Sequence, residues 1–170
     1  QTAGLTPLIS GALWAAPLVS GVSPAVCGVT AGNSSGLNDG ACALLLANQA
    51  GMERHGLSPL AEIVTSAVVG VEPRIMGIGP VAASKKALAR VGLTINDMDI
   101  IEINEAFAAQ VLANAKGLGV PEEKLNISGG GIALGHPIGA SGARVLVTLV
   151  HQLHRTGGRK GICSLCLGGG

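Results

Sequence analysis

His136 is the residue of this chain best suited to moving protons at neutral pH. It stands between Gly135 and Pro137, after a glycine run at 129–131 and before a helical pattern. Glycine lets a ligand approach the backbone, proline fixes the first turn of a helix, and an imidazole titrates close to neutrality. The pattern predicts a general base, while a histidine that caps the helix or binds a loop carbonyl is the alternative.

Cys166 is the second residue whose setting indicates chemistry, because glycines follow it at 168–170. Backbone N–H groups among such glycines can form an oxyanion hole beside a thiolate. A buried structural cysteine before a turn is the alternative interpretation. A redox pair with Cys163 is disfavoured, because residues three apart on a strand point to opposite faces.

Further polar residues lie at the expected boundaries of helices. Asn104 ends a β-like run and opens a helical one, so it fits either an N-cap or a residue that positions a water molecule. Glu105 is explained by stabilisation of the helix dipole. Ser35 fits capping and turn chemistry first and a ligand contact second. The glycines of the run 77–79 do not follow a clean strand, which argues against a nucleotide-binding loop.

These residues need a scaffold, and the second half of the chain alternates between strand and helix patterns. That alternation predicts a layered α/β fold. The candidate residues follow the carboxyl ends of strands, where ligands gather in such sheets. Residues 1–28 show no clear period, so no element is predicted there. We expect helices at 41–56, 81–91, 104–118 and 138–155, and strands at 60–71, 98–103, 126–128 and 161–166.

Composition narrows the class of protein. Hydrophobic residues make up 48% of the 170 and charged residues 12%, so the chain can bury a core. A net charge of +1 provides no basic surface for nucleic acid. The apolar stretch 13–26 is interrupted by Pro17 and Pro24, so we expect neither a membrane span nor a secretion signal. Four cysteines without a second Cys-x-x-Cys predict no metal site and a cytoplasmic location with reduced thiols.

Five motifs together resemble the thiolase family of acyl-CoA acyltransferases, which includes the acetyl-CoA acetyltransferases. Their spacing fits that family, with 32 residues from Asn104 to His136 and 30 from His136 to Cys166. The motifs are VTAGNSSGLNDGA (29–41), GVEPRIMGIGP (70–80), IEINEAFAAQ (101–110), NISGGGIALGHPIGASGAR (126–144) and CSLCLGGG (163–170).

The resemblance implies a fold and a domain boundary. Residues 29–170 resemble the C-terminal half of a thiolase, a layered mixed β-sheet flanked by helices, and we expect this fold to be truncated at its last strand. Residues 1–28 are an atypical apolar segment outside the resemblance. The family's acyl-carrying cysteine belongs to the N-terminal half, which has no counterpart here, and Cys27 lacks the setting of that nucleophile.

The resemblance also implies roles for individual residues. His136 is expected to activate the acyl-carrying cysteine, and Asn104 to position a water molecule in the first oxyanion hole. Cys166 is expected to remove a proton from the α-carbon of acetyl-CoA in Claisen condensation, and to supply one in the reverse reaction. The other implied positions are the Gly168 N–H in the second oxyanion hole, Ser35 near the pantetheine arm of CoA, and Met76 and Phe107 along the substrate channel.

These roles define the expected partners and the competing functions. The chain is expected to bind acyl-CoA and CoA without a metal or redox cofactor, and to turn over little or nothing alone. Its apolar composition indicates a homo-oligomer or pairing with a thiolase N-terminal half. One alternative is a non-catalytic, thiolase-derived interaction module. Another is a ketoacyl synthase, against which Cys166 before three glycines argues.

Overall fold

The computed structural model describes residues 6–13, for their backbone path, and residues 28–168. Its strands form one sheet in the order β2-β1-β4-β3, and each pairing is parallel. The layered α/β class is confirmed. The expectation of a mixed sheet is wrong for the described strands, since all of them run in one direction. The strands are Thr6–Leu13 (β1), Ser66–Gly70 (β2), Ile100–Ile103 (β3) and Lys160–Leu167 (β4).

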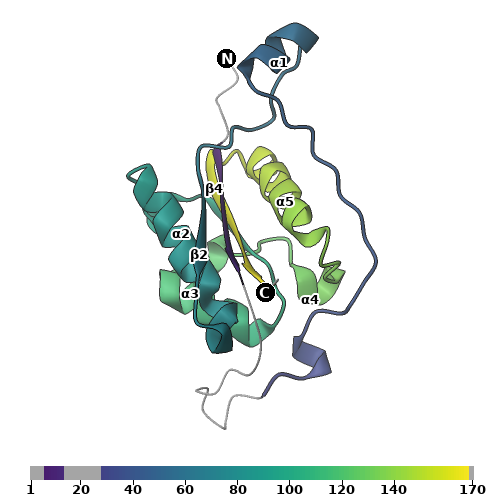
Figure 1. Ribbon diagram of the computed structural model, residues 1–170, viewed down its shortest axis with the longest axis vertical. Coiled ribbons are helices and arrows are strands. Elements are labelled where there is room, and N and C mark those ends of the chain that lie inside the picture. The colour runs from purple at the N-terminus through teal and green to yellow at the C-terminus, as the bar shows by residue number, and fades with distance from the viewer. Residues whose placement is uncertain (1–5, 14–27, 169–170) are drawn as a thin grey trace.

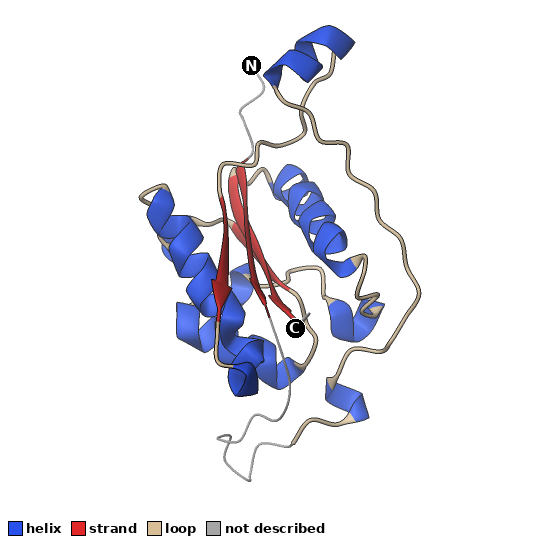
Figure 2. Ribbon diagram, in the orientation of Figure 1, coloured by secondary structure: helices blue, strands red, loops and turns tan. Residues whose placement is uncertain are grey.

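Helices cover both faces of this sheet and make three layers (Figures 1 and 2). On one face lie α2 (Gly79–Arg90) and α3 (Ala108–Leu118), and on the other α4 (Gly131–Leu134) and α5 (Ser141–Thr156). A separate helix, α1 (Gln49–His55), stands away from the layers. Short 3-10 turns complete the described chain at Ala31–Asn33 (η1), Pro73–Ile78 (η2), Ile95–Asp97 (η3) and Glu122–Lys124 (η4).

Two apolar clusters hold the layers together. Ile101, Ile103 and Ile162 face α2 and α3, whereas Ile100 and Cys163 face α5. Neighbouring residues of β3 and β4 therefore alternate between the faces, as the pleat of a strand requires. Burying a large aliphatic side chain contributes about 1.5–3 kcal/mol to the stability of the fold. The two clusters together therefore hold the ends of β3 and β4 in place relative to α5.

Most predicted elements are present, with shifted ends. The helices expected at 81–91 and 138–155 are α2 and α5, and the strand expected at 161–166 is β4. The strand expected at 60–71 is shorter, and the one expected at 98–103 begins later. The strand expected at 126–128 is a turn, in which Asn126 has a φ of 45°, and only Leu125 forms a bridge, to Ile101.

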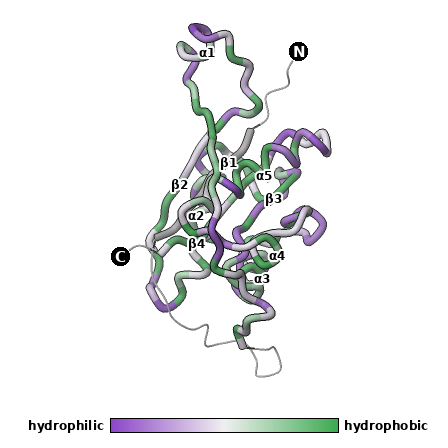
Figure 3. The backbone as a smooth tube through the Cα atoms, turned by 90° about the vertical axis from the view of Figure 1, so that its right-hand side faces the viewer, coloured by the Kyte–Doolittle hydropathy of each residue, from purple (hydrophilic) through white to green (hydrophobic). Residues whose placement is uncertain are grey.

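The helix expected at 41–56 is largely wrong. The Asn48 side chain accepts a hydrogen bond from the Gly51 N–H at 2.9 Å, so it caps a helix that begins only at Gln49. Residues 35–48 have no regular structure and run outside the α5 layer to the hydrophilic α1, which stands apart in Figures 1 and 3. Leu45 and Leu46 are 82% and 70% exposed. Helix propensity alone is a weak guide here, because a short helix depends on burying an apolar face and these leucines are not buried.

The largest difference from the sequence prediction is β1. No element was predicted within residues 1–28, yet Thr6–Leu13 runs between β2 and β4, with Thr6 in register with Lys160 and Leu13 with Gly70. Cys27 lies outside the described residues. Among the helices that the structure describes, none is long and apolar enough to cross a membrane.

Candidate active site

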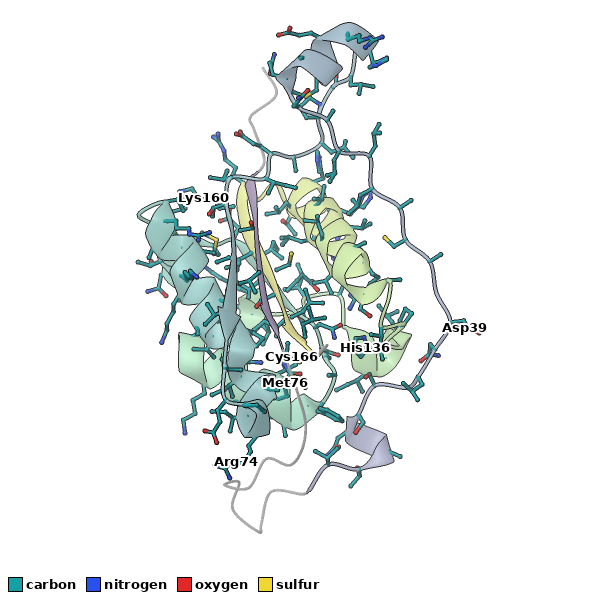
Figure 4. All side chains as sticks on the ribbon, viewed as in Figure 1. Asp39, Arg74, Met76, His136, Lys160 and Cys166 are labelled. Atoms are coloured by element: carbon teal, nitrogen blue, oxygen red, sulfur yellow. The ribbon has the colours of Figure 1, made fainter. Side chains whose placement is uncertain are left out.

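The carboxyl ends of β3 and β4 and the loop between α4 and α5 meet at one edge of the sheet. Asn104 directly follows β3, and its backbone N–H donates to the Ser164 carbonyl of β4 at 3.0 Å. Cys166 lies two residues further along β4. Figure 4 shows Cys166 and His136 at this end of the sheet, with Met76 beside β4. The structure thus brings the three candidate polar residues to a common edge.

Asn104 does not cap a helix. Helix α3 begins at Ala108, with Phe107 at its N-cap position. The Asn104 side chain is 1% exposed, and its Nδ2 lies 3.5 Å from His136 Nε2. Its Oδ1 accepts a hydrogen bond of 3.3 Å from Arg144 Nη2. The capping interpretation is therefore wrong, and the amide faces the histidine instead.

Polar groups contact both ring nitrogens of His136, Ser141 at Nδ1 and Asn104 at Nε2. The Ser141 hydroxyl donates its single proton to the Pro137 carbonyl at 3.0 Å. The same oxygen lies 2.6 Å from His136 Nδ1, an arrangement in which a protonated Nδ1 donates to the hydroxyl. Nε2 keeps its lone pair on the side of Asn104. This tautomer is the one that a general base at Nε2 requires.

The backbone of His136 is held by the loop that follows η1. The His136 N–H donates to the Gly36 carbonyl at 3.0 Å. Gly135 has a φ of 100°, and a Cβ built there would lie 2.4 Å from Cγ of Asn38. Only glycine combines that backbone conformation with so close a neighbour. Gly135 therefore allows the backbone turn before His136, and that turn sets the direction of the imidazole.

Burial sets the charge state of the two candidate groups. It lowers the pKa of His136, and the nearby Arg144 guanidinium lowers it further. It raises the pKa of the Cys166 thiol, against a smaller opposing effect of a backbone hydrogen bond. At neutral pH the site therefore holds a neutral imidazole and a protonated thiol. Such a pair can accept a proton at nitrogen and exchange one at sulfur.

The remaining sequence-predicted residues lie around the same edge. Ser34 forms an antiparallel bridge with Phe107, whose side chain is 39% exposed. Ser35 donates to the Ala106 carbonyl through its N–H at 3.0 Å and through its hydroxyl at 3.1 Å. Met76 is half-buried in η2, which packs on β4 and α3, and Gly168 is exposed directly after β4. The Ser35 hydroxyl is thus used to hold the loop, and ligand contacts at these positions are still predictions.

Glu105 has a function that the sequence reasoning missed. It precedes α3, so stabilisation of that helix dipole is the wrong explanation. Its carboxylate accepts hydrogen bonds from Asn126 Nδ2 at 2.8 Å and from the Ile132 N–H at 3.2 Å. A Cβ on Gly130 would lie 2.4 Å from Glu105 Cδ. The carboxylate therefore clamps the glycine run that leads to His136.

Ser141 and Arg144 were also missed, although their spacing carried a signal. They stand three apart on α5, directly after the Gly-His-Pro turn, and residues at that spacing share one face of a helix. Both side chains contact the candidate site. Within the described residues, no group of three or more His, Cys, Asp or Glu could hold a metal ion.

Comparisons with known proteins show which family has a similar sequence and fold. Residues 57–170 match the description "Thiolase, C-terminal domain". An acetyl-CoA acetyltransferase of Chromobacterium violaceum is 58% identical over 142 residues, which are 84% of this chain and 36% of that protein. The cytosolic acetyl-CoA acetyltransferase of Mus musculus is 56% identical over the same shares.

Solved structures agree. The acetyl-CoA acetyltransferase of Bacillus anthracis superposes with a TM-score of 0.80 at 55% identity, covering 84% of this chain and 36% of that one. The human mitochondrial 3-ketoacyl-CoA thiolase in complex with CoA superposes over the same shares, with a TM-score of 0.76 at 45% identity. The chain thus spans 36% of the length of these relatives.

The layered fold, the edge site and these likenesses define one class of protein: the chain belongs to the thiolase family. Within that family it corresponds to the C-terminal domain, and its similar proteins include acetyl-CoA acetyltransferases. The ketoacyl synthase alternative is set aside.

Proposed function

We propose that this chain supplies the proton-transferring part of a thiolase active site acting on coenzyme A thioesters. The reaction is Claisen condensation of two acyl-CoA molecules, such as acetyl-CoA to acetoacetyl-CoA, or the reverse thiolysis. The observation that carries the proposal is the placement of His136, whose Nε2 contacts Asn104 at the edge of the sheet where Cys166 lies. The names of the relatives and the CoA complex of the human enzyme support the substrate class.

The charge states fit the steps of such a reaction. His136 Nε2 accepts the proton of the acyl-carrying cysteine, and the Asn104 amide positions a water molecule beside the thioester oxygen. Condensation then needs a base at the α-carbon and donors at the enolate oxygen. The Cys166 thiol gives its proton to the CoA thiolate that leaves in the first acyl transfer, and the resulting Cys166 thiolate is that base, with the Gly168 N–H as the donor. In thiolysis the Cys166 thiol returns its proton to the α-carbon.

The acyl-carrying cysteine, in this proposal, lies in thiolase sequence outside the 36% that the chain spans. Leu37, Leu45 and Leu46 are 88%, 82% and 70% exposed, which supports a partner that covers them. A thiolase N-terminal half or a second copy of the chain would do so. We propose that thiolase-like sequence begins near residue 29, because the loop holding His136 includes Gly36, while β1 precedes that boundary and still pairs with β2 and β4 of the sheet.

Ser35, Met76 and Phe107 are proposed to contact the CoA arm and the acyl group, since they surround the same edge of the sheet. No metal or redox cofactor takes part in this chemistry. The mouse relative is named as cytosolic, and Cys42, Cys163 and Cys166 of the described chain are free thiols. Both observations support a reducing compartment such as the cytoplasm.

Thiolysis of acetoacetyl-CoA tests the proposal. The chain is assayed alone and after mixing with the N-terminal portion of a related acetyl-CoA acetyltransferase. We expect no turnover alone and measurable turnover in the mixture. His136→Ala and Cys166→Ala should each lower that rate by about 10²–10⁴-fold, the range for lost acid–base groups. His151→Ala, at an exposed position of α5, is the matched control.

A stable complex of the two portions without turnover would contradict the enzyme proposal. It would favour the non-catalytic interaction module instead, because association would then be the retained property.

A further inference from the structure

The first turn of α5 presents two polar side chains to the end of β3. Ser141 contacts His136 Nδ1 at 2.6 Å, and Arg144 contacts Asn104 Oδ1 at 3.3 Å. Asn104 and Ser141 are each only 1% exposed, so solvent does not compete for their hydrogen bonds. The helix therefore touches the imidazole from one side directly and from the other through the amide.

Arg144 determines which way the Asn104 amide is turned, that is, which side its oxygen and its NH2 group face. A guanidinium can only donate, so the Asn104 oxygen must face Arg144 and the NH2 group must face His136. That NH2 group can also only donate, so His136 Nε2 must accept. On the far side of the ring, Nδ1–H donates to Ser141, which donates to the Pro137 carbonyl. The hydrogen bonds run in one direction from Arg144 to Pro137.

The guanidinium has no competing hydrogen-bond partner in the described part of the chain. Its Nε and Nη1 are buried and unpartnered there, and Nη2 bonds Asn104. Glu102, which shares the α5 face of β3, is near enough to feel the charge, but its Oε1 has no partner among the described residues either. An ordinary buried salt bridge therefore does not explain Arg144.

We propose that Arg144 is a positioning residue that sets the orientation of the Asn104 amide and, through it, the proton-accepting tautomer of His136. The catalytic meaning of this role rests on the proposed function. Without the guanidinium, the amide is free to turn its oxygen toward Nε2. That orientation favours the Nε2–H tautomer, whose lone pair lies on Nδ1 beside Ser141, away from the edge of the sheet.

The test uses the full chain and needs no turnover. Long-range ¹H–¹⁵N correlation spectra of the ¹⁵N-labelled protein report the His136 tautomer, with the signal assigned by its loss in His136→Gln. We expect Nδ1–H in the parent and an increase of about tenfold in the ratio of Nε2–H to Nδ1–H in Arg144→Met, as for a lost hydrogen bond to a charged group. Arg144→Lys keeps a cationic donor and should retain Nδ1–H. Arg155→Met, on the same helix, should match the parent.

Arg144 is the charged group that acts on His136, and Arg144 and Glu105 both act on the buried Glu102 of β3. A purely structural role for Arg144 predicts lower thermal stability with the parent tautomer. A folded Arg144→Met protein that keeps Nδ1–H would therefore overturn the proposal.

If Arg144→Met does not fold, the same spectrum of Asn104→Asp tests whether the residue at position 104 determines the His136 tautomer. The two acceptor oxygens of that variant require a proton on Nε2, so Nδ1–H alone at neutral pH would refute the directed chain of hydrogen bonds. The thiolysis assay and this spectrum fail independently of each other, which separates the proposal from the proposed function.

Discussion

Glu102 is an acidic side chain in the interior of the fold. It is 1% exposed on β3, and burial raises its pKa to about 7, with Arg144 acting in the opposite direction and Glu105 adding to the rise. An unfolded chain would ionise this carboxyl near its ordinary value of 4.5. Between these two values the unfolded state loses the proton while the folded state keeps it. Glu102 therefore costs stability as the pH rises through this range, and the cost is complete above about pH 7.

Glu102→Gln should remove that cost. We expect the variant to be more stable than the parent by on the order of 1–3 kcal/mol at about pH 8 and nearly equal to it at about pH 4.5. Urea unfolding at both pH values measures the difference. Glu123→Gln, at an exposed position of η4, is the control. An equal gain at both pH values would show that the carboxyl is not titrating as described.

The two cysteines of β4 should differ in reactivity. Burial raises the pKa of Cys163 to about 12, and burial also raises the pKa of Cys166, which is only partly shielded from solvent. Because the thiolate is the reactive form, iodoacetamide should modify Cys166 slowly at neutral pH and faster in alkali, while Cys163 stays unmodified in the folded chain. Peptide mass spectrometry reports both, and all four cysteines should react in urea. Fast neutral modification of Cys163 would contradict its burial.

At the scale of elements, the turn before His136 depends on glycine in a way that the helix after it does not. A Cβ at Gly135 would meet Asn38 at 2.4 Å in a left-handed conformation, whereas Gly142 of α5 has nothing within 4 Å of a Cβ. Gly135→Ala should destabilise the fold by about 1–3 kcal/mol. Gly142→Ala should stabilise it by up to about 1 kcal/mol. Thermal unfolding compares the two variants, and we expect the melting temperature to fall in Gly135→Ala and to rise in Gly142→Ala.

Some elements could be predicted from sequence because local signals and packing agree there. Helix α2 has proline in its first turn and Gly92 beyond its end, and both its ends lie within two residues of the span 81–91 that the sequence predicts. The helix over 104–118 was started too early, because Asn104 and Glu105 make contacts that only the assembled sheet supplies. The strand expected at 126–128 failed for a related reason: Asn126 uses its side chain to bond both backbone groups of Ile103, at 2.8 and 2.9 Å.

The candidate site divides in the same way. His136, Cys166 and Asn104 could be proposed from their residue types and from the strands that precede them. Arg144 could not, because its role depends on which atom of Asn104 it faces. That relation exists only when α5 packs against β3, and the spacing of Ser141 and Arg144 indicates a shared helix face but not the atom that Arg144 contacts.

At the scale of the whole molecule, the loop over residues 35–48 leaves leucines uncovered. Leu45 and Leu46 are 82% and 70% exposed, so they contribute little to the folded monomer. The double variant Leu45→Glu/Leu46→Glu should reduce self-association by sedimentation velocity, with an unchanged melting temperature. Leu112→Glu, 62% exposed on α3, should leave association unchanged. A lower melting temperature in the double variant would mean that the leucines pack within the monomer.

The parallel sheet also governs the order in which the chain can be assembled during synthesis. Its interior strand β4 comes last in the described sequence and pairs with both β1 and β3. Until residues 160–167 leave the ribosome, β3 has no partner strand and β1 has only β2. Until that point the described part of the nascent chain carries open strand edges and uncovered apolar faces, which is the state that chaperones protect. Among the described strands, β4 joins β1 to β3, and the same strand carries Cys166.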